Sequence, residues 1–137
     1  MIVEPPEPTS ARWTHSDPAT ADLAAQLRRN LHAWLDARQL SDIAPDVVLA
    51  SYEVMANSVE HAYRDESSPG PLTLTAVHEN LVLTVTVSDA GTWKPAEPTP
   101  HRGRGLELAD AITDHVAVDH GSGTETTLTW DLDHSER

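Results

Sequence analysis

The chain has 137 residues, no cysteine and a formal net charge of −13 with histidine neutral. This length is enough for a domain with a hydrophobic core, and the absence of cysteine excludes disulfides, thiolate metal sites and a cysteine nucleophile. The negative charge disfavours direct binding to nucleic acid, and no apolar run reaches the roughly 20 residues of a membrane span. The N-terminus lacks the basic and apolar regions of a signal peptide, so we expect a cytoplasmic protein.

Composition predicts one domain with short flanking segments. Residues 1–9 are rich in proline and glutamate and are expected to be disordered. Residues 10–133 carry the regular hydrophobic patterns and are expected to form a single domain, with 134–137 as a tail.

The first half of this domain predicts a short strand and two helices. The strand is expected at 11–15, and Asp17 and Pro18 are expected to be the N-cap and the first position of a helix that ends near Arg38. The apolar stripe of this helix is expected to consist of Leu23, Leu27, Leu31, Trp34 and Leu35. A second helix is expected from about residue 44, with a proline in its first turn, to about residue 64.

The second helix has two faces at the helical period. The apolar face, expected to be buried, is formed by Val48, Tyr52, Met55, Val59 and Ala62. The polar face is formed by Glu53, Asn57, Glu60 and His61. Such an organised polar face is either a solvated surface or part of a site.

The second half predicts a hairpin, a long proline-rich loop, a helix and two closing strands. Their expected ranges are 71–78 and 81–89 for the hairpin, 90–102 for the loop, 105–113 for the helix, and 115–120 and 124–132 for the strands. The order β-α-α-β-β-α-β-β predicts an α/β (α+β) fold. We expect a two-layer α/β sandwich in which helices cover one side of a mixed sheet.

Several common sites are absent from the sequence. It has no GxxxxGK[ST] phosphate loop, no GxSxG elbow, no HExxH motif and no pair of histidines four residues apart. A cluster of metal-binding histidines is therefore not expected.

The polar helix face could bind a metal and accept a proton. An asparagine oxygen such as that of Asn57 suits Mg²⁺, which usually shares substrate phosphates, and Glu53 one turn earlier could accept a proton from a hydroxyl. Asp89 ends an apolar strand, where its carboxylate could accept a hydrogen bond from an exocyclic amine of a ligand. Gly91 would let the backbone pass close to the ring of that ligand.

A basic, glycine-containing segment follows the loop. Arg102 and Arg104 are the only arginines between residues 64 and 137, and Gly103 and Gly105 permit a tight backbone before a helix whose N–H groups could face an anion. A glycine turn then leads into a threonine-rich strand that begins at residue 124. Each segment alone also has an ordinary structural explanation as a turn or a strand.

The order of these segments is more specific than any one of them. ExxxNxxxHA on a helix, DxG after a strand, GxGL at a helix start and GTxTxL in the last strand resemble the GHKL ATPase superfamily and its Bergerat nucleotide fold. The resemblance covers roughly residues 45–130. Size, the "EHAY" segment and "RGRGLELADAITDHVAV" are most similar to bacterial anti-sigma-factor serine kinases of the RsbW and SpoIIAB type, including actinobacterial relatives.

The resemblance implies roles for individual residues. Glu53 would be the general base and Asn57 the Mg²⁺ ligand, while Asp89 would read the adenine amino group. The remaining nucleotide-binding positions that it implies are His61, Ala62, Gly91, Arg102, Gly103, Arg104, Gly105, Leu106 and Thr124. Trp93 stands where the family's DxGxG box has its second glycine.

The implied function is that of an ATP- and Mg²⁺-dependent serine/threonine protein kinase. Its partners would be a sigma factor, which it binds, and a STAS-type anti-sigma-factor antagonist, which it phosphorylates. The resemblance also suggests a homodimer. Two alternatives remain open: a nucleotide-binding regulatory module that sequesters a partner without kinase activity, and an isolated domain of a larger regulator.

Overall fold

The computed structural model describes residues 10–64, 66–91, 104–121 and 123–132. Its elements follow the predicted order: β1 (Ser10–Pro18), α1 (Ala21–Ala37), α2 (Ala44–His61), β2 (Pro71–Glu79), β3 (Val82–Asp89), α3 (Arg104–Ile112), β4 (His115–Asp119) and β5 (Thr124–Asp131). The predicted N-terminal segment 1–9, the tail 134–137 and most of the loop 90–102 lie outside the described residues.

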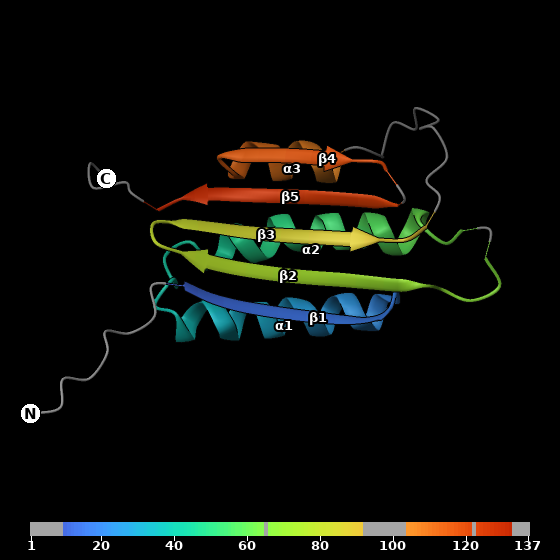
Figure 1. Ribbon diagram of the computed structural model, residues 1–137, viewed down its shortest axis with the longest axis horizontal. Coiled ribbons are helices and arrows are strands. Elements are labelled where there is room, and N and C mark those ends of the chain that lie inside the picture. Colours follow the sequence, from blue (N-terminus) through green and yellow to red (C-terminus); the bar gives the residue numbers. More distant parts are fainter. Residues whose placement is uncertain (1–9, 65, 92–103, 122, 133–137) are drawn as a thin grey trace, which may run out of the picture.

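The strands form one five-stranded sheet in the order β1-β2-β3-β5-β4. Figure 1 shows α1, α2 and α3 on the same face of this sheet, so the predicted two-layer α/β sandwich is confirmed. The prediction of a mixed sheet was wrong, because every neighbouring pair of strands is antiparallel. β4 does run parallel to β3, but β5 lies between them and pairs with both.

Helix α1 packs through a leucine stripe, as predicted. Its fully buried side chains include Leu27, Leu31 and Leu35. The predicted N-cap at Asp17 was wrong, because Asp17 and Pro18 continue β1 and pair with the start of β2. Thr20 is the N-cap instead, and its hydroxyl accepts the Leu23 N–H at 3.0 Å.

The buried face of α2 differs from the predicted one. Its buried residues are Ala44, Val47, Ala50, Ser51, Val54, Met55 and Ser58. Of the predicted apolar face, Met55 and Ala62 are buried, whereas Tyr52 and two valines are only partly buried. Small residues on the buried face let α2 approach the sheet closely. Tyr52 lies on the α1 side of the helix, where the Arg28 guanidinium carbon is 4.9 Å from the centre of the Tyr52 ring.

The predicted hairpin and closing strand are confirmed. β2 and β3 pair across a short turn in which Asn80 has a positive φ of 55°. On β5 the buried side chains are Thr124, Thr126, Leu128 and Trp130, as the alternation predicts. Trp130 donates its indole N–H to the Ile112 carbonyl at 2.9 Å and so fixes the end of α3 against the sheet. None of the helices in the described part of the chain is long and apolar enough to span a membrane.

Candidate functional site

Asp89 is a buried carboxylate at the end of β3, and both of its oxygens accept hydrogen bonds. Its side chain is 8% exposed. The Ser58 hydroxyl donates to Oδ2 at 2.8 Å, and the Gly91 N–H donates to Oδ1 at 3.1 Å. These two donors fix the orientation of the Asp89 carboxylate, and each carboxylate oxygen can accept more than one hydrogen bond.

The Ser58–Asp89 hydrogen bond joins α2 to the end of β3. Ser58 follows Asn57 directly, so this bond also fixes the helical turn that carries Asn57. Glu53 lies four residues earlier on α2, about 6 Å along the helix axis. Both Glu53 and Asn57 are half-buried, and neither has a hydrogen-bond or ion-pair partner among the described residues. Their polar atoms are therefore available to a ligand.

Thr124 lies directly across the sheet from Asp89. The two residues are paired in the antiparallel register of β3 and β5, and Thr124 is 4% exposed. A Cβ atom on Gly123 would lie 2.1 Å from the Asp89 carbonyl oxygen, and Gly123 has φ of 154°. Glycine before Thr124 is thus required for this approach. His120 lies near the Thr124 hydroxyl, with Nδ1 at 3.3 Å from Oγ1.

Gly91 and Ala62 meet through their backbones. A Cβ atom on Gly91 would lie 2.0 Å from the Ala62 carbonyl oxygen, so only glycine allows the chain after β3 to pass the end of α2. A contact of Ala62 with nucleotide stays a prediction.

His61 contacts neighbouring charged residues on the last turn of α2. Its Nδ1 lies 2.6 Å from the Arg64 guanidinium, and its Nε2 lies 3.7 Å from the Glu60 carboxylate. Because a guanidinium can only donate, Nδ1 accepts and carries no proton. Burial first, and then the positive charge of Arg64, lower the pKa of His61. The neutral ring is therefore favoured, and a direct role in nucleotide binding stays a prediction.

Tyr63 is a residue of the site region that the sequence reasoning missed. Its hydroxyl accepts the Ala90 N–H at 2.8 Å and donates to the Pro71 carbonyl at 2.6 Å. Its ring packs on Gly70, where a Cβ atom would lie 2.7 Å from Cε1. The one available signal was its place two residues after His61, in the "EHAY" segment.

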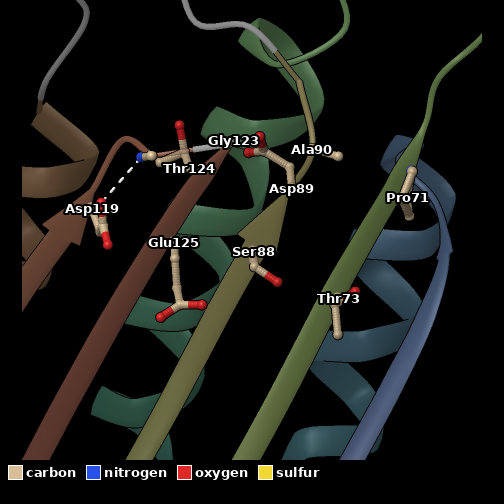
Figure 2. A pocket seen from close by; sticks show the side chains of 10 residues that line it. Pro71, Thr73, Ser88, Asp89, Ala90, Asp119, Gly123, Thr124 and Glu125 are labelled. Atoms are coloured by element: carbon tan, nitrogen blue, oxygen red, sulfur yellow. Dashed lines mark hydrogen bonds between the residues drawn. The ribbon is translucent and has the colours of Figure 1, made fainter.

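A cavity of about 410 Å³ opens at this end of the sheet (Figure 2). Asp89 and Thr124 line it, together with Pro71, Thr73, Ser88, Ala90, Asp119, Gly121, Gly123 and Glu125. The cavity therefore contains the strand-end part of the predicted site. Glu53 and Asn57 do not line it. Thr73, Ser88 and Glu125 alternate with buried residues along their strands, so they belong to the sheet face away from the helices. The cavity is therefore lined partly by the sheet face away from the helices and partly by residues at the strand ends.

The predicted basic segment is described only in part. Arg102 and Gly103 lie outside the described residues. Arg104, Gly105 and Leu106 form the first turn of α3, as the GxGL motif predicts for a helix start, and the structure describes their backbone alone. Free N–H groups at a helix N-terminus favour an anion.

Asn57 fits a magnesium ion that is bound mainly through its substrate. Among the described residues no group of three or more His, Cys, Asp or Glu side chains is placed to hold a metal ion. Mg²⁺ usually keeps several waters and takes few protein ligands besides substrate phosphates. The half-buried Asn57 carboxamide, with no partner in the described part of the chain, meets that requirement.

Comparison with known proteins identifies the family. The model of the histidine kinase-like ATPase domain matches residues 18–130. Among solved structures, the chain is similar to the RsbU and RsbW domains of Rv1364c from Mycobacterium tuberculosis, with a TM-score of 0.66 and 27% sequence identity. That match covers 89% of this chain and 32% of the other, so the chain spans about a third of the neighbour's length.

The family match covers the elements that carry the candidate site. The matched residues include α2 with Glu53 and Asn57, Asp89 at the end of β3, and Thr124 on β5. They support an ATP-binding domain of the kinase or regulatory type. The chain belongs to the histidine kinase-like ATPase family, the GHKL superfamily, and within it is similar to RsbW.

Proposed function

We propose that this chain binds ATP with Mg²⁺ and transfers the γ-phosphoryl group to a serine or threonine hydroxyl of a STAS-type anti-sigma-factor antagonist. In the same proposal the chain also binds and inactivates a sigma factor. The observation that supports it most directly is the Asp89 carboxylate at the end of β3, which is buried and oriented by Ser58 and Gly91, in a residue that lines the cavity.

The nucleobase would be recognised at the strand ends. An adenine amino group is a hydrogen-bond donor, and the Asp89 carboxylate is an acceptor. Thr124 lies across from Asp89 and could contact the same ring directly or through water. A carboxylate that accepts a hydrogen bond from the amine favours adenine over bases with a carbonyl at that position.

The phosphoryl transfer would take place along α2. Asn57 would hold Mg²⁺, which supplies neutralisation of the phosphate charge when bound. Glu53 would accept the proton of the substrate hydroxyl. At the same time the oxygen of that hydroxyl would form a bond to the γ-phosphorus, and the bond between the γ-phosphorus and ADP would break. Arg102, Arg104 and the backbone at 103–106 would contact the phosphates. Transfer of this kind needs mainly positioning and charge stabilisation, so few side chains suffice.

The partners follow from the likeness to RsbW. The structural neighbour combines RsbU and RsbW domains in one chain, which supports a role in partner-controlled regulation. A sigma factor, a STAS-type antagonist, a homodimer, a cytoplasmic location and a single domain of residues 10–133 are all parts of the proposal.

A second candidate function is a regulatory module that binds nucleotide and sequesters a partner without phosphorylating it. The sequence observation that favours it is Trp93, which stands where the DxGxG box has its second glycine. Both candidates share the nucleotide site and differ only in the transfer step.

The two functions can be separated with one assay. The protein is incubated with γ-labelled ATP, with or without Mg²⁺, and with candidate STAS antagonists from the same genome. Mg²⁺-dependent appearance of phosphoserine or phosphothreonine on an antagonist supports the kinase. Tight ATP binding with no labelled antagonist in the full set supports the sequestering module, and absence of ATP binding contradicts both.

A further inference from the structure

Tyr63 connects the end of α2 to two strands. It lies in the turn that follows α2 (Ala44–His61), yet its hydroxyl contacts the backbone after β3 and at the start of β2. The hydroxyl accepts the Ala90 N–H at 2.8 Å and donates to the Pro71 carbonyl at 2.6 Å, so both of its hydrogen-bonding roles are used.

Both partners of this hydroxyl line the cavity. Pro71 and Ala90 are lining residues, and Ala90 lies between Asp89 and Gly91. The next N–H along the chain, that of Gly91, binds the Asp89 carboxylate at 3.1 Å. Movement of Ala90 would therefore change the position of the carboxylate that the proposed function assigns to adenine.

Two glycines make room for this arrangement. A Cβ atom on Gly70 would lie 2.7 Å from Cε1 of Tyr63, and one on Gly91 would lie 2.0 Å from the Ala62 carbonyl oxygen. The tyrosine ring and the helix end are thus both in close contact with backbone, and the hydroxyl has little freedom to move.

We propose that Tyr63 is a positioning residue for nucleobase recognition: its hydroxyl holds Ala90 and Pro71 in place, and thereby sets the direction of the Asp89 carboxylate. This inference rests on the proposed binding of ATP. Tyr63 itself contacts no nucleotide in this proposal; it acts through Ala90, which follows Asp89, and through Pro71 on β2, next to the residue that pairs with Asp89.

Tyr63→Phe tests the inference because it keeps the ring and removes only the hydroxyl. The probes are ATP and purine riboside triphosphate, which lacks the amino group that Asp89 would read. We expect the ratio of the analogue's dissociation constant to that of ATP to fall about threefold to tenfold in the variant, mainly through weaker ATP binding. In a transfer assay KM for ATP should rise while kcat changes little, because Tyr63 does not contact the reacting atoms.

Tyr52→Phe is the matched control. Tyr52 is the only other tyrosine, and it lies on α2 under Arg28, on the α1 side of the helix. The same loss of a hydroxyl there should leave the ratio unchanged. A purely structural role of Tyr63 would weaken both nucleotides equally and would leave the ratio at its wild-type value, which would overturn the inference.

A second variant keeps the test valid if Tyr63→Phe folds poorly. Gly70→Ala retains the Tyr63 hydroxyl but displaces the Tyr63 ring, and we expect it to lower the same ratio of dissociation constants. If both folded variants keep the wild-type preference for ATP, the inference is wrong and the proposed function stands. If the wild type itself shows no preference for ATP over the analogue, the assignment of Asp89 fails and the inference fails with it.

Discussion

The two ends of the candidate site are held in different ways. At the strand ends, Asp89 accepts hydrogen bonds from Ser58 and Gly91, and Thr124 is buried opposite it. Along α2, Glu53 and Asn57 are half-buried and have no partner in the part of the chain that the structure describes. Groups that are already hydrogen-bonded support both the fold and the ligand, whereas groups without partners serve the ligand alone. Substitutions at the two ends should therefore differ in their effect on stability.

The largest effect is expected for the proposed base. Glu53→Gln keeps the size of the side chain and removes its ability to accept a proton, so phosphoryl transfer should slow by at least about a hundredfold. ATP affinity should stay near normal. The free energy of unfolding should change by less than about 0.5 kcal/mol, because Glu53 has no hydrogen bond or ion pair with the described residues to lose.

Single-turnover phosphorylation and thermal melts measure these two quantities on the same samples. A variant that transfers phosphate at the wild-type rate would remove Glu53 from the role of base without affecting the kinase proposal. A large loss of stability would show that Glu53 supports the fold as well as the ligand.

Asp89→Asn should affect binding and stability together. The amide can turn a donor toward the adenine amine and toward the Ser58 hydroxyl, and a lost hydrogen bond to a charged group is worth about 1.5–3 kcal/mol. ATP affinity should fall about tenfold or more in calorimetry, and the melting temperature should fall as well. Asp42→Asn, in the exposed connection between α1 and α2, is the charge-matched control. Unchanged ATP affinity would exclude Asp89 from the site.

Asn57→Ala should have a smaller effect that depends on the metal. Removal of one Mg²⁺ ligand weakens the metal-bound complex and leaves the nucleobase contacts intact. ATP affinity should therefore drop several-fold with Mg²⁺ present and change little in EDTA. An equal loss under both conditions would indicate a direct phosphate contact or a role in folding.

The smallest effect is expected for His61, the last residue of α2. Burial first, and then Arg64, lower the pKa of His61, which follows Ser58 by three residues on α2. Its folded-state pKa is below the value of about 6.5 for an unfolded chain, so the folded state binds fewer protons and this contribution to stability is lost as pH falls below that value. His61→Gln should reduce the acid-induced loss of stability in melts between pH 7 and pH 5.

His78 has to be treated in the same experiment. Burial, and then Arg38, lower its pKa as well, while a backbone hydrogen bond at Asn80 acts in the opposite direction. His78→Gln alone should also reduce the acid-induced loss, and the double variant should reduce it further. A pH dependence that is identical in wild type and both single variants would contradict the two assignments.

Local sequence patterns predicted the helices and strands, whereas the order and direction of the strands in the sheet depend on pairing between distant segments. Strict alternation on β2, β3 and β5 and the leucine stripe of α1 are set by neighbours in sequence, and the predictions for them were confirmed. The antiparallel sheet depends on β5 lying between β3 and β4, which no local pattern records.

Within the site, sequence motifs selected residue types, but tertiary contacts fixed how they are held. The register brings Asp89 and Thr124 together, although they are 35 positions apart in the numbering. The Ser58 and Tyr63 hydrogen bonds could not be predicted, because a serine inside a helix or a tyrosine after it has many ordinary uses. The buried face of α2 was misjudged for a related reason: Ser51 and Ser58 are buried despite their polar side chains.

The strand order has a consequence for how the protein is made. Asp89 ends β3, whereas Thr124 belongs to β5, which inserts between β3 and β4 only after α3 and β4 have been synthesised. Domains fold as units during synthesis, and contacts between distant segments form late. A nascent chain that stops after α3 would carry Asp89 without Thr124 or the β5 wall of the cavity. Nucleotide could therefore stabilise the chain only after the last strand has entered the sheet, and ribosome-bound chains of increasing length should gain ATP-dependent protease resistance in a single late step.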